Sequence, residues 1–241
     1  IIDPLETLKI EKDTSFLMMR EAQHRRHQIW VATPKEIKFL GDKVVVNAQQ
    51  LLINDESENW YEVTESKDLI SPNLDCIIMR KDPPFDMEYV YSTYLLEALE
   101  NEGCRVFNRP QSIRDFNEKL AITKYPQFIA PSLVTADLTA IKSFIKNHKE
   151  VVLKPLDGMG GSSVFRSRPD DPNLGVILET LTELGCRTIM VQKFIPQISA
   201  GDKRVLLIDG EPVPYSLARI PQGSDHRGNL AAGGRGVAMA L

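Results

Sequence analysis

The sequence predicts an α/β protein in which helices cover a parallel sheet, and two observations support this class. Short apolar strands at residues 76–79 and 104–108 flank an amphipathic helix that begins at Met87. Strands that alternate with helices in this way favour a parallel sheet with helical layers. The chain has 241 residues, of which 42% are apolar and 26% are charged. This composition is typical of a soluble globular protein, and the length allows one large domain or two smaller ones.

The first half of the chain carries local signals for each of its elements. Asp13, Thr14 or Ser15 can cap a helix that runs to about residue 28, and a strand is expected at 29–32. Gly41-Asp42 separates the runs 36–40 and 43–53, which is a hairpin signal. The helix after Asp86 ends before Gly103, a typical C-terminal cap. Its spacing predicts one inward face, made of Met87, Val90, Tyr91, Tyr94, Leu95, Ala98 and Leu99.

The second half predicts further helices and strands. A helix is expected at 114–122, and Asp137 can cap another helix with Leu138, Ile141, Phe144 and Ile145 inward. A helix at 174–184 and a strand at 188–195 precede a hairpin, 204–208 and 212–218, around Asp209-Gly210. The glycine-rich residues 220–236 contain few large apolar side chains. That segment is therefore expected to be either disordered or an active-site lid.

The charge, the apolar runs and the cysteine and histidine positions give no sign of nucleic-acid binding, a membrane helix or a zinc site. The formal net charge of −4 gives no argument for nucleic acid or an anionic membrane as a partner. No apolar run approaches the roughly 20 residues that a membrane helix needs. Three scattered cysteines fit reduced thiols in a cytosolic protein. The histidines do not show the pattern of a zinc site; they are His24, His27, His148 and His226.

Residues 151–165 are the most informative part of the chain. An apolar strand carries Lys154 near its end, and Gly158, Gly160 and Gly161 follow before a second strand from residue 164. Glycine permits positive φ and lets backbone N–H groups approach a ligand closely. A lysine beside such a turn predicts a nucleotide polyphosphate as the ligand, with a plain hairpin beside a surface lysine as the alternative. The Walker pattern and the dinucleotide fingerprint are excluded, because no Gly-Lys pair occurs and Ser163 stands where the third glycine is needed.

Other candidate ligand contacts lie at the ends of predicted elements. Arginine and lysine there suggest an anion site, although solvated surface charges are the alternative for each. These cations are Lys119, Arg204, Arg219 and Arg235. The segment Gln192, Lys193, Phe194 and Ile195 leaves an apolar strand and could receive adenine, or could be only a strand end. Asp202 could accept from a ribose hydroxyl, or could serve only in a turn.

Several longer motifs together resemble the bacterial glutathione synthetases, a family of the ATP-grasp superfamily. The match runs over nearly the whole chain. Single motifs are shared with other ATP-grasp ligases, whereas the combination of the segments 80–86 and 228–235 is much more specific. The matching segments are 79–86 (MRKDPPFD), 108–112 (NRPQS), 117–120 (NEKL), 153–161 (LKPLDGMGG), 201–204 (GDKR), 209–214 (DGEPVP), 218–222 (ARIPQ) and 227–236 (RGNLAAGGRG).

The resemblance implies an ATP-grasp fold with α+β subdomains, preceded by a Rossmann-like domain with a parallel sheet. It implies domains at 1–118, 119–196 and 197–241, the last truncated. The implied activity joins γ-glutamylcysteine to glycine through an acyl phosphate, with ATP converted to ADP and phosphate. Mg²⁺ is the implied metal, with Mn²⁺ as the alternative, and a cytoplasmic homo-oligomer is the implied state.

Residue roles also follow from the resemblance. Lys119 and Lys154 are expected to contact the ATP phosphates, and Gly158, Met159, Gly160 and Gly161 to cover them. Gln192, Lys193, Phe194 and Ile195 are the expected adenine hinge, and Asp202 a ribose contact. Arg204, Arg219 and Arg235 are expected to be catalytic, and residues 220–235 to form a mobile lid. The expected substrate contacts are Arg80, Arg219, Asn229, Gly233 and Gly234.

The chain departs from the family pattern at both ends. The family holds its metal with an acidic–acidic–Asn set that is expected after Leu241, so no metal ligand is predicted in this chain. The first strand is also expected to be mostly missing, and a fragment of this kind is expected to be inactive. Two alternatives remain open at this point. One is another ATP-grasp ligase of the D-alanine–D-alanine or glutamate type, and the other is a non-catalytic nucleotide-binding module.

Overall fold

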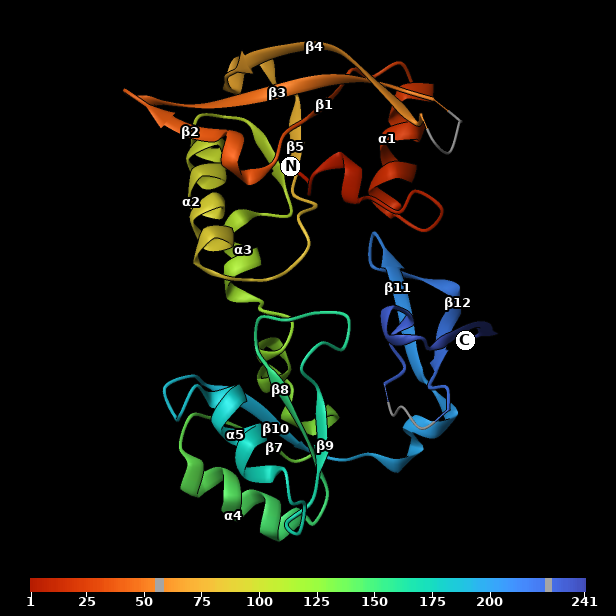
Figure 1. Cartoon of the computed structure of the whole chain (residues 1–241). Coiled ribbons are helices and arrows are strands. Elements are labelled where there is room, and N and C mark those ends of the chain that lie inside the picture. The colour runs from red at the N-terminus through yellow and green to blue at the C-terminus, as the bar shows by residue number, and fades with distance from the viewer. Residues whose placement is uncertain (55–58, 224–226) are drawn as a thin grey trace. The chain divides into compact units, whose positions relative to one another are not determined.

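A computed structural model describes residues 1–54, 59–223 and 227–241 of the chain. The chain divides into two compact units, Ile1–Asn117 and Glu118–Leu241, and each is described by itself (Figure 1). His226 and two other residues of the expected lid lie outside the described residues. No helix in the described ranges is long and apolar enough to cross a membrane. Short 3₁₀ turns connect the main elements; they are Leu5–Thr7, Pro34–Glu36, Ser71–Asn73, Leu120–Lys124, Pro126–Phe128, Pro196–Ala200 and Leu230–Ala232.

The first unit is built on an antiparallel sheet around a long central strand. Strand β3 (Lys43–Ile53) pairs with β1 (Ile29–Val31), β2 (Ile37–Leu40) and β4 (Tyr61–Leu69). Gly41 has φ +69° in the β2–β3 turn, so the predicted hairpin is confirmed. The sequence analysis missed β4, because most of its side chains are polar and exposed and show no apolar alternation.

A two-stranded parallel sheet accompanies this antiparallel sheet. Strand β5 (Cys76–Ile78) pairs in parallel with β6 (Arg105–Phe107), and helix α2 (Met87–Asn101) connects them. The backbone N–H of Tyr89 donates to Oδ1 of Asp86 at 2.9 Å, which confirms the predicted cap. The predicted strand–helix–strand alternation is therefore present, and within the described residues its parallel pairing is confined to β5 and β6.

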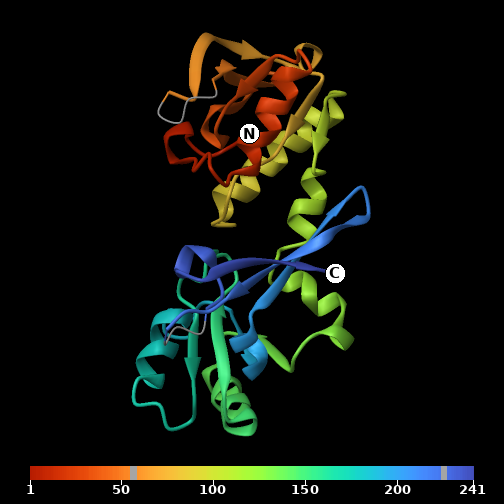
Figure 2. The same cartoon turned by 90° about the vertical axis from the view of Figure 1, so that its right-hand side faces the viewer.

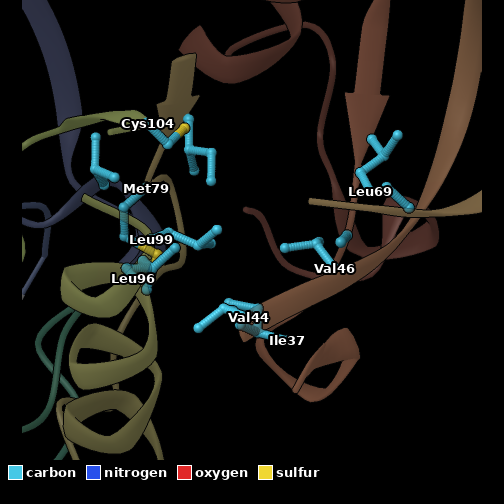
Figure 3. Packing of buried hydrophobic residues seen from close by; sticks show 12 residues of the cluster. Ile37, Val44, Val46, Leu69, Met79, Leu96, Leu99 and Cys104 are labelled. Carbon is cyan, nitrogen blue, oxygen red and sulfur yellow. The ribbon is translucent and has the colours of Figure 1, made fainter. Parts of the chain in front are cut away.

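The inward face of α2 agrees only in part with the predicted one: Leu99 is buried and Leu95 and Ala98 pack against the core, but the predicted tyrosines do not. Its buried residues are Ser92, Thr93, Leu96 and Leu99, whereas Met87, Tyr91 and Tyr94 are each more than half exposed. The hydroxyls of Ser92 and Thr93 donate to backbone carbonyls within the helix, both at 2.6 Å, so these small residues can be buried without unsatisfied donors. Figure 3 shows Leu96 and Leu99 packed between the helix and Val44 of β3.

Two other helices in the first unit end earlier than predicted. Helix α1 (Thr14–His24) begins after Asp13, whose Oδ1 accepts from the backbone N–H of Ser15 at 2.6 Å. It ends before Arg26, whose φ of +67° cannot continue a right-handed helix. Helix α3 (Pro110–Asp115) starts at a proline, and the expected continuous helix 114–122 is wrong, because only a separate 3₁₀ turn follows at Leu120–Lys124.

The second unit contains a four-stranded antiparallel sheet with two helices. The strand order is β7 (Ser132–Thr135), β10 (Ile189–Lys193), β8 (Val151–Pro155) and β9 (Phe165–Ser167). Helices α4 (Leu138–His148) and α5 (Leu174–Thr182) pack on it through a core that includes Ile141, Ile145, Leu153 and Ile189. Asp137 caps α4 as predicted, and α5 ends where Glu183 and Leu184 adopt positive φ.

A second, three-stranded sheet forms the C-terminal part of this unit. Strands β11 (Asp202–Ile208) and β12 (Glu211–Ile220) make the predicted hairpin, with φ of +52° at Asp209 and +82° at Gly210. Strand β13 (Arg235–Ala240) then pairs with β12, as the blue strands of Figure 2 show. The sequence analysis missed β13, because the strand follows a glycine-rich segment and its partner strand is known only from the fold.

Candidate active site

The glycine turn between β8 and β9 adopts a backbone that few other residues accept. Gly160 and Gly161 have φ of +66° and +83°, and Ser163 follows with +54°. Such conformations cost a residue with a Cβ roughly 1–2 kcal/mol. The strand–turn–strand arrangement predicted from residues 151–165 is therefore confirmed, and the backbone favours glycine at Gly160 and Gly161.

The two predicted phosphate lysines both lie near this turn. The Nζ of Lys119 donates to the carbonyl oxygen of Gly158 at 2.8 Å and also pairs with Glu118. Lys154 lies on β8 opposite Met190 of β10. Burial lowers the pKa of Lys154, the nearby charge of Lys119 lowers it further, and Glu118 acts against both. Two ammonium groups in one partly buried region favour an anion between them.

A third cation, Arg187, holds the beginning of the turn. Its Nη2 donates to both carboxylate oxygens of Asp157, at 2.6 and 2.8 Å. The sequence analysis missed this residue, because its partner lies 30 positions away and no local pattern connects them.

The described part of the expected lid packs against the tip of the turn. Nη1 of Arg227 donates to the carbonyl oxygen of Gly161 at 2.9 Å. A Cβ at Gly161 would lie 2.8 Å from Oδ1 of Asn229, and one at Gly160 would lie 3.6 Å from Cβ of Ala231. The residues around Asn229 therefore lie in direct contact with the glycine turn.

The predicted catalytic Arg219 is held by the predicted ribose contact, Asp202. Nε and Nη2 of Arg219 donate to the two carboxylate oxygens of Asp202, at 2.7 and 2.6 Å. The two residues face each other at adjacent ends of β11 and β12. This bidentate pair fixes the plane of the guanidinium. The N–H groups of Nη1 take no part in the pair and point away from Asp202.

The other two predicted catalytic arginines lie on the same sheet. Arg204 is opposite Leu217, so the strand period places it on the same face as Arg219. Arg235 is opposite Ile220 and so lies on the other face. Both side chains are exposed. The sheet therefore brings Arg204 and Arg219 to one face and separates Arg235 from them.

The predicted adenine hinge already uses several of its polar groups. Gln192 donates to Oγ of Ser132 at 2.7 Å, and the backbone N–H groups of Lys193 and Phe194 donate to the carbonyls of Pro131 and Glu150. Phe194 is buried, and the guanidinium of Arg166 lies 3.9 Å from its ring centroid. Ile195 is half exposed, so it offers the most accessible apolar surface of this segment.

The remaining predicted substrate contacts divide between the two units. Arg80 lies in the first unit, where it donates to the hydroxyls of Ser15 and Thr14 at 3.1 and 2.6 Å. Gly233 ends the 3₁₀ turn Leu230–Ala232 with φ +90°, and Gly234 lies tightly against the carbonyl of Gly228.

No group of three or more His, Cys, Asp or Glu side chains that could hold a metal ion occurs in the part of the chain that the structure describes.

Comparison with known families decides how this site is interpreted. A family model described as "Prokaryotic glutathione synthetase, ATP-grasp domain" matches residues 118–241, and its N-terminal counterpart matches residues 1–114. The chain belongs to the prokaryotic glutathione synthetase family.

Relatives and solved structures agree with this membership. The chain is 51% identical to the glutathione synthetase of Nitrosomonas europaea and 49% identical to that of Escherichia coli O6:H1. In both cases 100% of the chain aligns with 76% of the relative. The ATP-grasp ligase PsnB complexed with minimal precursor has a TM-score of 0.55 at 15% identity, over 100% of this chain and 75% of that one. This likeness shows the ATP-grasp fold.

Proposed function

We propose that the intact protein joins γ-glutamylcysteine to glycine and converts ATP to ADP and phosphate. The observation that carries the proposal is 47–51% identity to glutathione synthetases over the whole chain. The cations around the glycine turn support it, because Lys119 and Lys154 offer the positive charge that a polyphosphate requires.

The proposed reaction has two steps. A cysteinyl carboxylate oxygen forms a bond to the γ-phosphorus of ATP, the bond to the bridging oxygen breaks, and ADP leaves. The glycine amine then attacks the acyl carbon, the new amide forms, and phosphate leaves as the nitrogen loses a proton. Both steps move negative charge, so they depend on fixed cations more than on a protein nucleophile.

Each group of residues has a proposed part in these steps. Lys119, Lys154 and residues 158–161 bind the phosphates, and residues 192–195 receive adenine. Arg219, oriented by Asp202, is placed at the reacting carboxyl and phosphoryl groups, with Arg204 on the same face. Asp202 also contacts the ribose. Arg80, Asn229, Gly233 and Gly234 bind the peptide substrate. The segment 220–235, with Arg235, excludes water from the acyl phosphate.

Further parts of the proposal rest on family membership. Mg²⁺, with Mn²⁺ as a substitute, would neutralise phosphate charge when bound. Residues 1–118, 119–196 and 197–241 act as three domains. The protein works in the cytoplasm as a homo-oligomer.

Product formation by the intact protein tests the proposal. Phosphate release and tripeptide formation are measured with γ-glutamylcysteine plus glycine, with D-alanine, and with glutamate plus an acceptor peptide. We expect equal amounts of phosphate and tripeptide with the first pair alone. Phosphate release with D-alanine or glutamate instead would reject this substrate assignment, and ATP binding without any turnover would indicate a non-catalytic module.

The variant Arg219→Ala tests the chemistry. Loss of one such donor commonly lowers turnover by about 10²–10³, and we expect ATP affinity to change much less. Arg25→Ala is the matched control, because Arg25 also pairs with a carboxylate, Glu21 at 2.7 Å, but on an exposed helix of the first unit. Near-normal turnover of Arg219→Ala at saturating substrates would refute the role.

A further inference from the structure

Arg187 is linked to the start of the glycine turn and has no part in the proposed reaction steps. Arg187 lies two residues before β10, and Ile189 of that strand is opposite Pro155 at the end of β8. The fold therefore places Arg187 beside the chain as it leaves β8. Its Nη2 contacts both oxygens of Asp157, the residue directly before Gly158, and its Nη1 donates to Glu183 at 3.0 Å.

We propose that Arg187 is a positioning residue for ATP, which acts by anchoring and neutralising Asp157 at the start of the glycine turn. This inference rests on the proposed function, because it takes ATP phosphates as the ligand of the turn.

Charge is the first reason for this role. Asp157 places a carboxylate next to a turn that is expected to surround phosphates, and like charges in a partly buried region repel one another. Side chains of Arg187 and Asp157 are 39% and 32% exposed, so water screens their charges only in part. The ion pair offsets the charge of Asp157, so this carboxylate no longer works against the attraction of Lys119 and Lys154 for phosphate.

The second reason is that the ion pair of Arg187 and Asp157 does not depend on bound ATP. Three cations hold the turn, at Asp157 through Arg187, at Gly158 through Lys119 and at Gly161 through Arg227. Lys119 is proposed to contact phosphate, and Arg227 belongs to the proposed lid. Of these three contacts, the pair of Arg187 and Asp157 involves neither a proposed phosphate ligand nor a residue of the proposed lid, so it can hold the start of the turn with or without ATP.

ATP affinity of the intact protein, measured by calorimetry without peptide substrates, tests the proposal. Arg187→Ala is expected to weaken ATP binding by about five- to tenfold, the range of a partly exposed charge pair with a coupled partner. Adding Asp157→Asn to that variant removes the unpaired carboxylate and should recover part of the lost affinity. Arg187→Lys, whose ammonium can reach the same carboxylate, should bind within about threefold of the original protein.

Controls separate this role from a structural one. Glu183 is the other ion-pair partner of Arg187, and the side chain of Glu183 is 62% exposed. Glu183→Gln weakens that second ion pair and should leave ATP affinity unchanged. If Arg187→Ala does not fold, Arg187→Gln replaces it. A lower melting temperature with ATP affinity within twofold of the original, or additive effects in the double variant, would overturn the proposal. An unsubstituted protein that binds ATP but makes no tripeptide would refute the ligase assignment and still leave this comparison decisive.

Discussion

A methyl group at Gly161 is the most direct test of the contact between the glycine turn and the segment around Asn229. Gly161 has φ +83°, and an added Cβ would lie 2.8 Å from Oδ1 of Asn229 and 3.2 Å from Cδ of Arg227. Gly160 is a matched control, because it also has positive φ, +66°, but its Cβ would meet only Cβ of Ala231 at 3.6 Å, an ordinary contact. The two alanine variants therefore share the backbone cost and differ in crowding.

The expected losses of ATP affinity follow from the backbone cost and the crowding. Positive φ costs an alanine roughly 1–2 kcal/mol, which corresponds to about a 5- to 30-fold loss of ATP affinity if the free turn can relax and the bound turn cannot. Crowding in a packed site adds roughly 1–3 kcal/mol. We therefore expect Gly160→Ala to bind ATP about tenfold more weakly and Gly161→Ala to lose at least about a further fivefold.

Calorimetric titration with ATP and a product assay measure both effects. Gly161→Ala should also release phosphate without a matching amount of tripeptide, because the displaced segment no longer excludes water. Asn229→Ala in the Gly161→Ala protein should recover the crowding part of the ATP affinity. Equal affinities for the two glycine variants, or no recovery in the double variant, would refute the packing argument.

Three further predictions concern the lysine, the lid and the core. Because burial lowers the pKa of Lys154, ATP affinity should fall as pH rises through that pKa. The stability of the ligand-free protein should rise with pH between that pKa and about 10.4, since the unfolded chain there binds more protons. Both trends, measured by calorimetry and thermal unfolding, should disappear in Lys154→Arg. Shortening the segment 220–235 should leave ATP binding largely intact and raise the ratio of phosphate to tripeptide, whereas a constant ratio at normal rate would reject a lid. Leu96→Ala, at a fully buried site, should lower the free energy of unfolding in urea by about 2–5 kcal/mol, and Tyr91→Ala, at a side chain that is 53% exposed, by less than about 1 kcal/mol.

Elements with a local cause could be predicted from the sequence. Asp13, Asp86 and Asp137 each cap the helix expected of them, because the cap needs only N–H groups two or three residues away. Both predicted hairpins form at turns with positive φ, at Gly41 and at Asp209-Gly210. The glycine turn belongs to the same class, since its conformation depends on residues within a few positions.

Elements with a distant cause could not be predicted in the same way. Helix α2 has apolar side chains on two faces, and spacing alone selected the one that carries Tyr91 and Tyr94. The fold instead buries the face with Ser92 and Thr93, whose hydroxyls are satisfied inside the helix. Strands β4 and β13 are defined by pairing with β3 and β12, and neither has the alternation that would reveal a strand.

The same distinction explains which parts of the candidate site were visible. The glycines of the turn were found because the backbone favours them, whereas Arg187 and Arg166 were missed because their partners are remote in sequence. Contacts within the protein also affect how much a predicted residue contributes to ATP affinity. In the structure Lys119 already donates to the carbonyl of Gly158 and pairs with Glu118, so a phosphate competes with these partners for the ammonium group. The affinity that Lys119 contributes is then the difference between its charge-assisted bonds to phosphate and whatever it gives up with Gly158 and Glu118. A lysine held in this way adds less to ATP affinity than its charge suggests, but its position beside the turn is set before ATP arrives.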